Sequence, residues 1–219
     1  MRLTHLGHAC LLVETGGARL LIDPGTFSAG FEELTALDAV LITHQHVDHV
    51  DGDRLPRVLA GNPDARLLAE PELTEQLLTA GWAATAFPAG ETMPFAGASV
   101  RAVGGRHATI HDPGIPVVGN IGLVIGADGE PTLFHPGDSY QVTPEGIDIL
   151  ALPLNAPWTN VQETIDFAHA VSPATVVPVH DGLLSPVGRG VYLRVVGGLL
   201  PERSALLDLA GAGPAELTP

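Results

Sequence analysis

The sequence predicts a layered α/β protein with mixed β-sheets, built as one domain over residues 1–219. Three observations support this prediction. The first apolar runs are separated by a Gly-Gly turn, which is typical of β-hairpins. Farther along, short apolar runs alternate with segments of helical periodicity, as they do when helices cover a sheet. The chain has 219 residues, 45% of them apolar, which is enough for one full core but leaves no room for a second large domain.

The N-terminal hairpin is the first predicted element. Its strands are Arg2–Leu6, Ala9–Glu14 and Arg19–Ile22, and the turn between the last two is Thr15-Gly16-Gly17. The third strand ends at Asp23-Pro24-Gly25, because the proline and glycine interrupt a regular strand.

After the hairpin we expect strands and helices in alternation. Helices are predicted where the apolar periodicity is helical, at Leu55–Ala60, Pro71–Ala80, Val161–Val171 and Arg189–Val196. The segment 82–103 is strand-like but broken by turns, and the Pro- and Gly-rich segments 104–116 and 181–190 are predicted loops near the functional site. The remaining predicted strands are Ala39–Thr43, Arg66–Ala69, Asn120–Ile125, Pro131–His135, Asp148–Leu152 and Thr175–Val179.

The charge balance is strongly acidic. Ten basic residues, all of them arginine, stand against 25 acidic residues, for a formal net charge of −15. Nucleic-acid binding needs clustered Lys or Arg against the phosphates, so we expect no nucleic-acid partner. The single Cys10 cannot form an internal disulfide, and no stretch approaches the ~18 apolar residues that a membrane span needs. A cytoplasmic protein with no membrane partner is therefore expected.

A histidine-rich segment directly follows the apolar run Ala39–Ile42. In Thr43-His44-Gln45-His46-Val47-Asp48-His49, four metal-competent side chains fall within six residues. On a chain that leaves a strand in extended conformation, His44 and His46 point to the same side, whereas in a helix they would point apart. The alternative is a solvated polar loop that is rich in histidine by chance. The spacing favours a loop that feeds two adjacent metal ions.

This segment resembles the signature His-x-His-x-Asp-His of the metallo-β-lactamase fold hydrolases. The resemblance extends from the N-terminal hairpin to about residue 185, over several motifs in the same order. It implies the fold of that family, a four-layer αβ/βα sandwich with two mixed β-sheets. It also implies that the remaining metal ligands lie farther along the chain.

Those ligands are implied residue by residue. His107, after Gly104-Gly105-Arg106, matches the family's third histidine, and His111 competes with it for that role. Asp138 matches the carboxylate that both metals share, and His180 matches the histidine at a strand end that completes the second site. The implied sets are His44, His46 and His107 for the first metal, Asp48, His49 and His180 for the second, and Asp138 for both.

The resemblance implies a dinuclear hydrolytic centre. Five imidazoles and two carboxylates suit Zn²⁺, Mn²⁺ or Fe²⁺, and Zn²⁺ is the default for an imidazole-rich hydrolytic site. Two adjacent ions hold a bridging water and lower its pKa from about 16 toward about 7, so that the resulting hydroxide is the nucleophile. Asp48 and Asp138 are then the catalytic carboxylates, because they fix that hydroxide.

Other residues are candidates to support the ligands or to contact the substrate. Asp23 resembles the family's strand-end aspartate, which accepts hydrogen bonds from the ligand loop. Leu6-Gly7-His8-Ala9 resembles the opening of a subgroup that includes L-ascorbate-6-phosphate lactonase, so His8 either faces the active site or is a packed strand histidine. Trp158 either lines the pocket or fills a packing position. These candidates are His8, Asp23, Arg106, His111, Asn120, His135 and Trp158.

Departures from the family pattern narrow the function. Zinc β-lactamases place a cysteine in the second site, whereas the only cysteine here is Cys10 in the first hairpin. Flavodiiron oxidases carry a glutamate where His46 stands, which argues against oxygen reduction. Nucleases of the superfamily usually add a domain or a long substrate-binding arm, for which this acidic chain offers no candidate.

We therefore expect a metal-dependent hydrolase, not a true β-lactamase, that acts on a small-molecule ester, lactone or phosphoester. One alternative is a phosphodiesterase or nuclease of the same superfamily, which would need a basic groove. Another is a non-catalytic metal- or ligand-binding scaffold, which would bind metal without turnover. The expected partner is a small-molecule substrate; soluble proteins commonly form homo-oligomers, and no pattern in this sequence specifies one.

Overall fold

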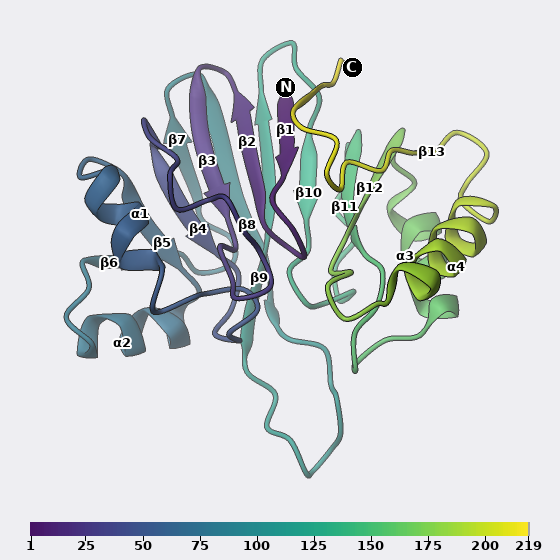
Figure 1. Cartoon of the computed structure of the whole chain (residues 1–219), viewed down its shortest axis with the longest axis horizontal. Coiled ribbons are helices and arrows are strands. Elements are labelled where there is room, and N and C mark those ends of the chain that lie inside the picture. Colours follow the sequence, from purple (N-terminus) through teal and green to yellow (C-terminus); the bar gives the residue numbers. More distant parts are fainter. Residues whose placement is uncertain (219) are drawn as a thin grey trace.

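Two β-sheets pack face to face, and helices cover both outer faces (Figure 1). The computed structural model describes residues 1–218. Each sheet has seven strands and mixes parallel with antiparallel pairs. The four layers follow the order helix, sheet, sheet, helix, which confirms the predicted α/β sandwich with two mixed sheets.

The first sheet is formed mainly by the N-terminal part of the chain. From β14 to β3 its strands pair antiparallel, and from β3 to β6 they pair parallel. In spatial order its strands are β14 (Ala215–Glu216), β1 (Arg2–His5), β2 (Leu11–Thr15), β3 (Ala18–Ile22), β4 (Ala39–Ile42), β5 (Arg66–Ala69) and β6 (Ala84–Ala86).

The second sheet has the same mixture of pairings. From β13 to β10 its strands pair parallel, and from β10 to β7 they pair antiparallel. In spatial order its strands are β13 (Ala205–Leu206), β12 (Thr175–Val179), β11 (Ile149–Pro153), β10 (Leu133–His135), β9 (Gly119–Ala127), β8 (Ala98–Arg106) and β7 (Thr92–Phe95).

Four helices form the outer layers. Helices α1 (Leu55–Gly61) and α2 (Pro71–Thr79) cover the first sheet, and α3 (Val161–Val171) and α4 (Pro186–Gly197) cover the second (Figure 1). Their starts carry the expected signals. Proline occupies the first turn of α1, α2 and α4, and Asn160 forms a capping box with Glu163 at the start of α3.

The buried apolar side chains form three clusters that match these layers. The central cluster lies between the sheets and includes Leu20, Leu41, Val100 and Val177. The two outer clusters lie under the helices, one against the first sheet and the other against the second. Because strand side chains alternate between faces, neighbouring residues of β4 serve two clusters, as Leu41 and Ile42 do.

Several elements begin or end one or two residues from their predicted bounds, and the larger differences concern the segment 82–103, helix α4 and two short strands. The strand-like segment 82–103 contains parts of three strands, β6, β7 and β8. Helix α4 extends beyond the predicted 189–196 at both ends. At its start, Ser185 accepts a hydrogen bond from Gly188 N–H and caps a turn that begins at Pro186. The strands β13 and β14 were not predicted, since each has only two residues and no sequence periodicity can mark them.

In the part of the chain that the structure describes, no helix is both long and apolar enough to cross a membrane.

Candidate metal centre

Two groups of side chains at one edge of the sandwich could each hold a metal ion. Within each group, the potential ligand atoms lie within 4.8 Å of one another. They come from strand ends and from the turn between β1 and β2, so both sheets contribute. The first group is His44, His46, His107 and Asp138, and the second is His8, Asp48, His49 and His180.

The histidine-rich segment follows β4 as a tight loop that presses against the residues after β3. A Cβ atom added to Gly25 would lie 1.8 Å from the carbonyl oxygen of Asp48 and 2.5 Å from the amide nitrogen of His49. Only a glycine leaves room for this approach, since any side chain here would force the backbone of the loop to move. The loop closes on itself through hydrogen bonds from the His49 and Val50 N–H groups to the His46 carbonyl.

Asp23 anchors this loop from the end of β3. Its Oδ1 accepts a hydrogen bond from Thr43 N–H at 2.8 Å, and its Oδ2 accepts from the Thr43 hydroxyl and from His49 Nδ1–H, both at 2.7 Å. Asp23 is fully buried and adopts the left-handed conformation with φ 46°. It therefore fixes which ring nitrogen of His49 carries the proton and directs Nε2 into the centre.

Asp138 is held by a turn that begins where β10 ends. Its backbone N–H donates to Asn120 Oδ1 at 2.9 Å. The side-chain amide of Asn120 in turn donates from Nδ2 to the Pro136 carbonyl at 3.0 Å. Gly137 adopts φ 61°, and a Cβ there would lie 2.3 Å from Asn120 Oδ1. His135 is buried in β10 and bonds the Ala9 carbonyl and Gly137 N–H, so it supports the turn and does not face the centre.

His107 and His111 have different surroundings, although the sequence alone left both as candidates. His107 follows β8, is buried, and donates from Nδ1 to the Ala108 carbonyl at 2.6 Å. Its Nε2 lies 3.6 Å from Asp138 Oδ2. His111 is exposed in the loop between β8 and β9 and belongs to neither group.

His180 enters from the second sheet, directly after β12. It adopts the left-handed conformation with φ 55°, and its Nδ1 donates to the Asn155 carbonyl at 2.7 Å. Its Nε2 lies 3.1 Å from Asp138 Oδ2 and 3.6 Å from Asp48 Oδ2. His8 approaches from the turn after β1, with its Nε2 3.1 Å from Asp48 Oδ2.

Four buried atoms in this centre have no hydrogen-bond partner among the described residues: His49 Nε2, His107 Nε2, His180 Nε2 and Asp138 Oδ1. His49 Nε2 and Asp138 Oδ1 lie 3.1 Å apart without forming a hydrogen bond. Burying such atoms without a partner is costly. Three imidazole nitrogens and a carboxylate oxygen that converge in this way fit divalent cations, which accept both kinds of ligand.

The buried charges shift the pKa values of this centre. Burial raises the pKa of Asp138, but the charges of His49 and His180 outweigh it and hold the pKa well below its usual range. Burial likewise opposes the ionised form of Asp48, whereas the hydrogen bond from His8 and the charge of His49 lower its pKa to about 2. Both carboxylates are therefore ionised at neutral pH, as metal ligands must be.

The pKa values of His49 and His180 are raised, whereas that of His44 is lowered. Burial lowers the pKa of His49, but Asp138 and Asp23 outweigh this effect and raise the pKa well above its usual value. Burial also opposes the charged form of His180, and Asp138 again reverses the balance and raises its pKa. Burial and the charge of His49 lower the pKa of His44. The carboxylate of Asp138 thus favours the protonated form of both rings.

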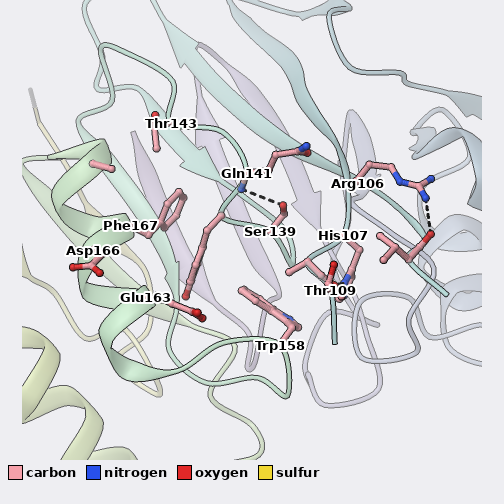
Figure 2. Close-up of a pocket in the computed structure, with 14 residues that line it drawn as sticks. Arg106, His107, Thr109, Ser139, Gln141, Thr143, Trp158, Glu163, Asp166 and Phe167 are labelled. Atoms are coloured by element: carbon pink, nitrogen blue, oxygen red, sulfur yellow. Dashed lines mark hydrogen bonds between the residues drawn. The ribbon is translucent and has the colours of Figure 1, made fainter. Parts of the chain in front are cut away.

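A cavity of about 760 Å³ opens beside the centre (Figure 2). His107 and Trp158 form its inner end, where the indole Nε1–H of Trp158 donates to Asp138 Oδ2 at 2.8 Å. Tyr140 and Phe167 provide apolar walls. Arg106 also lines the cavity, but its guanidinium already pairs with Glu72 at 3.3 Å and donates to the Val117 carbonyl at 2.9 Å.

Several residues of the site were not singled out from the sequence. The Thr43 hydroxyl links Asp23 to the ring of His44, and Gly182 N–H bonds His8. Ser139 and Tyr140 line the cavity. Thr43 and Ser139 are adjacent in sequence to a candidate ligand and Tyr140 lies two residues after Asp138, which is a signal that could have been used. Gly182 carries no such signal, because its contribution is a backbone N–H.

Comparison with known proteins identifies the family. The model of the beta-lactamase superfamily domain matches residues 2–180. The chain belongs to the β-lactamase superfamily. It is 50% identical to Protein Rv0786c of Mycobacterium tuberculosis over 214 residues, covering 94% of this chain and 99% of that protein.

Other superfamily members resemble the chain over most of its length. It is 31% identical to a UPF0173 metal-dependent hydrolase of Azorhizobium caulinodans, with 90% of this chain and 93% of that protein covered. The crystal structure of the metallo-beta-lactamase fold protein YhfI from Bacillus subtilis superimposes with a TM-score of 0.71 at 18% identity, covering 94% of this chain and 95% of that one. That likeness shows the shared fold.

Proposed function

We propose that this chain, a metal-dependent hydrolase of the β-lactamase superfamily, holds two divalent cations and hydrolyses a small-molecule ester or lactone. The observation that carries the proposal is the set of four buried atoms without hydrogen-bond partners on His49, His107, His180 and Asp138. The proposed ligands are His44, His46 and His107 for one ion, Asp48, His49 and His180 for the other, and Asp138 for both.

The cations would supply the activated water, because a divalent ion lowers the pKa of a bound water from about 16 toward about 7 and also polarises the bond under attack. The chain's own residues supply the rest. Asp23, Thr43 and Asn120 fix the orientation of the proposed ligands before any substrate arrives. Asp48 and Asp138, ionised at neutral pH, orient the water and accept its hydrogen bonds.

The cavity beside the centre is the proposed substrate site. Its inner end at His107 and Trp158 adjoins the proposed ligands, and its walls at Tyr140 and Phe167 are apolar. Arg106, the only arginine that lines it, is already paired with Glu72. A phosphorylated substrate would find no unpaired arginine along these walls, so these contacts favour a carbonyl ester or lactone with an apolar body over a phosphoester.

The test pairs metal analysis with hydrolysis. Purified protein is loaded with Zn²⁺ or Mn²⁺, its metal content is measured, and it is assayed on matched panels of esters, lactones and phosphoesters. We expect about two ions per chain and hydrolysis of esters or lactones. His107→Ala should lose both metal and activity, whereas His111→Ala should retain both, because His111 is exposed and outside the cluster.

Three outcomes would contradict the proposal in different ways. Full activity in metal-free protein would refute the metal mechanism. Two bound ions without hydrolysis on any panel would identify a binding scaffold. Activity confined to phosphoesters would refute the assignment to esters and lactones.

A further inference from the structure

Four histidines of the centre share one arrangement of their ring nitrogens. His49, His107 and His180 donate from Nδ1 to Asp23, the Ala108 carbonyl and the Asn155 carbonyl. His44 Nδ1 lies 3.1 Å from the Thr43 hydroxyl, whose own proton goes to Asp23. When each of these rings is neutral, Nδ1 carries the proton and Nε2 holds the lone pair. In His49, His107 and His180 that Nε2 has no partner in the described part of the chain, and in His44 it lies 3.1 Å from His46 Nδ1.

His8 has the reverse arrangement. Its Nδ1 lies 3.1 Å from the backbone nitrogen of Gly182. A backbone N–H can only donate, so His8 Nδ1 must accept and cannot carry a proton. The proton of the neutral ring then sits on Nε2, which lies 3.1 Å from Asp48 Oδ2 and donates to it. Both ring nitrogens of His8 are thus engaged, whereas three of the other rings leave Nε2 without a partner.

The backbone holds His8 in this orientation. His8 adopts the left-handed conformation with φ 50°, and its carbonyl accepts a hydrogen bond from His180 N–H at 2.8 Å. Gly182 must come close to the ring to donate, and a Cβ there would lie 3.0 Å from His8 Nδ1. The segment 180–182 therefore donates hydrogen bonds both to the His8 carbonyl and to the His8 ring. The ring is almost fully buried, so no water competes for these bonds.

We propose that His8 is a positioning residue and not a metal ligand: its Nε2–H donates to Asp48 Oδ2 and so fixes this carboxylate beside His180 Nε2, where the second cation would bind. The spatial grouping of His8 with Asp48, His49 and His180 does not distinguish a ligand from a donor, but the tautomer does. A nitrogen that carries a proton has no lone pair to give to a metal. This inference rests on the proposed function in one respect only, the presence of the cation.

Two substitutions separate the two hydrogen bonds of His8. His8→Asn keeps an acceptor near the position of Nδ1 for Gly182 N–H, does not reach Asp48, and is tolerated at a positive φ. His8→Gln places an amide donor near the position of Nε2 and so restores the bond to Asp48. We expect Zn²⁺ affinity to fall about 10- to 100-fold in His8→Asn, the usual effect of losing a residue that orients a ligand, and to recover in His8→Gln.

The direct readout is the protonation of the His8 ring. Long-range ¹H–¹⁵N NMR spectra distinguish protonated from unprotonated ring nitrogens, and the His8 signals are assigned by their loss in His8→Asn. We expect a proton on Nε2 and none on Nδ1, both before and after loading with Zn²⁺ alone. Loss of the Nε2 proton on loading, or equal Zn²⁺ affinity in His8→Asn and wild type, would overturn the proposal. A protein that takes up no metal would instead refute the proposed function, while the tautomer of His8 stays measurable.

Discussion

The indole Nε1–H of Trp158 donates a hydrogen bond of 2.8 Å to Asp138 Oδ2. The same side chain forms part of the wall of the cavity beside the centre, as Figure 2 shows. Trp158 therefore connects two parts of the site: it orients the carboxylate proposed to bridge the cations, and it contacts whatever enters the cavity. A movement of the Trp158 ring caused by a molecule in the cavity would therefore also alter the orientation of Asp138.

Trp158→Phe removes the N–H donor and retains an aromatic wall. We expect Zn²⁺ affinity to fall about tenfold, because Asp138 loses a partner that orients it. The measurement is competition with a chelator. Trp82→Phe is the matched control, since Trp82 packs under the first helical layer. With only two tryptophans in the chain, Trp82→Phe also isolates the fluorescence of Trp158, which should change on metal addition. An unaltered affinity in Trp158→Phe would show that its bond to Asp138 has no effect on binding.

Gly25→Ala should disrupt the ligand loop. The added methyl group would lie 1.8 Å from the Asp48 carbonyl oxygen, so the backbone of the loop must move. We expect a loss of roughly 1–3 kcal/mol of unfolding free energy, the usual cost of overpacking, together with weaker metal binding. Gly190→Ala is the control, because nothing lies within 4 Å of that position in α4. Urea unfolding of both variants decides the matter, and equal stabilities would contradict the crowding argument.

Asp23→Asn should weaken metal binding without removing any proposed ligand. The amide keeps one acceptor oxygen, but it loses the charge and one of the two oxygens that serve Thr43 and His49. We expect metal affinity to fall about 10- to 100-fold, since His49 is no longer held in one tautomer. The exposed Asp64→Asn serves as the control. If chelator competition gives the same affinity for both variants, Asp23 does not support the centre in this way.

Removing metal should destabilise the fold. The four buried atoms without partners would each gain one from a bound cation. A cation that binds the folded state alone adds RT ln(1 + [L]/Kd), or about 2.7 kcal/mol at 100 times Kd. We expect chelators to lower the melting temperature and Zn²⁺ to restore it, with a smaller gain in His107→Ala. Identical melting curves with and without chelator would contradict the prediction.

Glu130, which lies away from the candidate metal centre, should make the free energy of unfolding depend on pH. Hydrogen bonds from the Thr15 hydroxyl and from Gly16 N–H lower its pKa to about 2 from a model-peptide value of 4.5. Because the folded pKa is the lower one, the contribution is complete above about pH 4.5 and is lost as the pH falls toward 2. Glu130→Gln should cost about 1 kcal/mol or less at pH 7, since solvent screens this partly exposed group.

The measurement for Glu130 is urea unfolding of wild type and Glu130→Gln between pH 7 and pH 3. The difference between their free energies of unfolding should shrink below about pH 4.5, because Glu130 takes up a proton in the unfolded wild-type chain while it is still ionised in the folded one. The other titrating groups are common to both proteins and cancel. A difference that stays constant over this range would mean that the charge of Glu130 does not contribute.

Local patterns in the sequence were sufficient to predict the layered α/β class and the ligand loop, and the family resemblance added the four-layer sandwich. Short apolar runs predicted strands such as Arg66–Ala69, and helical periodicity predicted the helix Val161–Val171. The spacing of His44 and His46 after a strand predicted that they would lie together, and the structure places both in one group. These features depend on backbone geometry within a few residues, which the sequence carries directly.

Only the tertiary structure distinguished residues whose roles depend on distant partners. His107 and His111 lie four residues apart in one loop, yet only His107 meets Asp138. The tautomer of His8 is set by Gly182, and Trp158 meets Asp138 because the loop after β11 folds back over the turn after β10. No local pattern determines these contacts, since packing of one sheet against the other fixes which atoms meet. The sequence by itself determined the layered fold and the ligand loop, and the packing of the two sheets decided which groups face the proposed cations and which hold them in place.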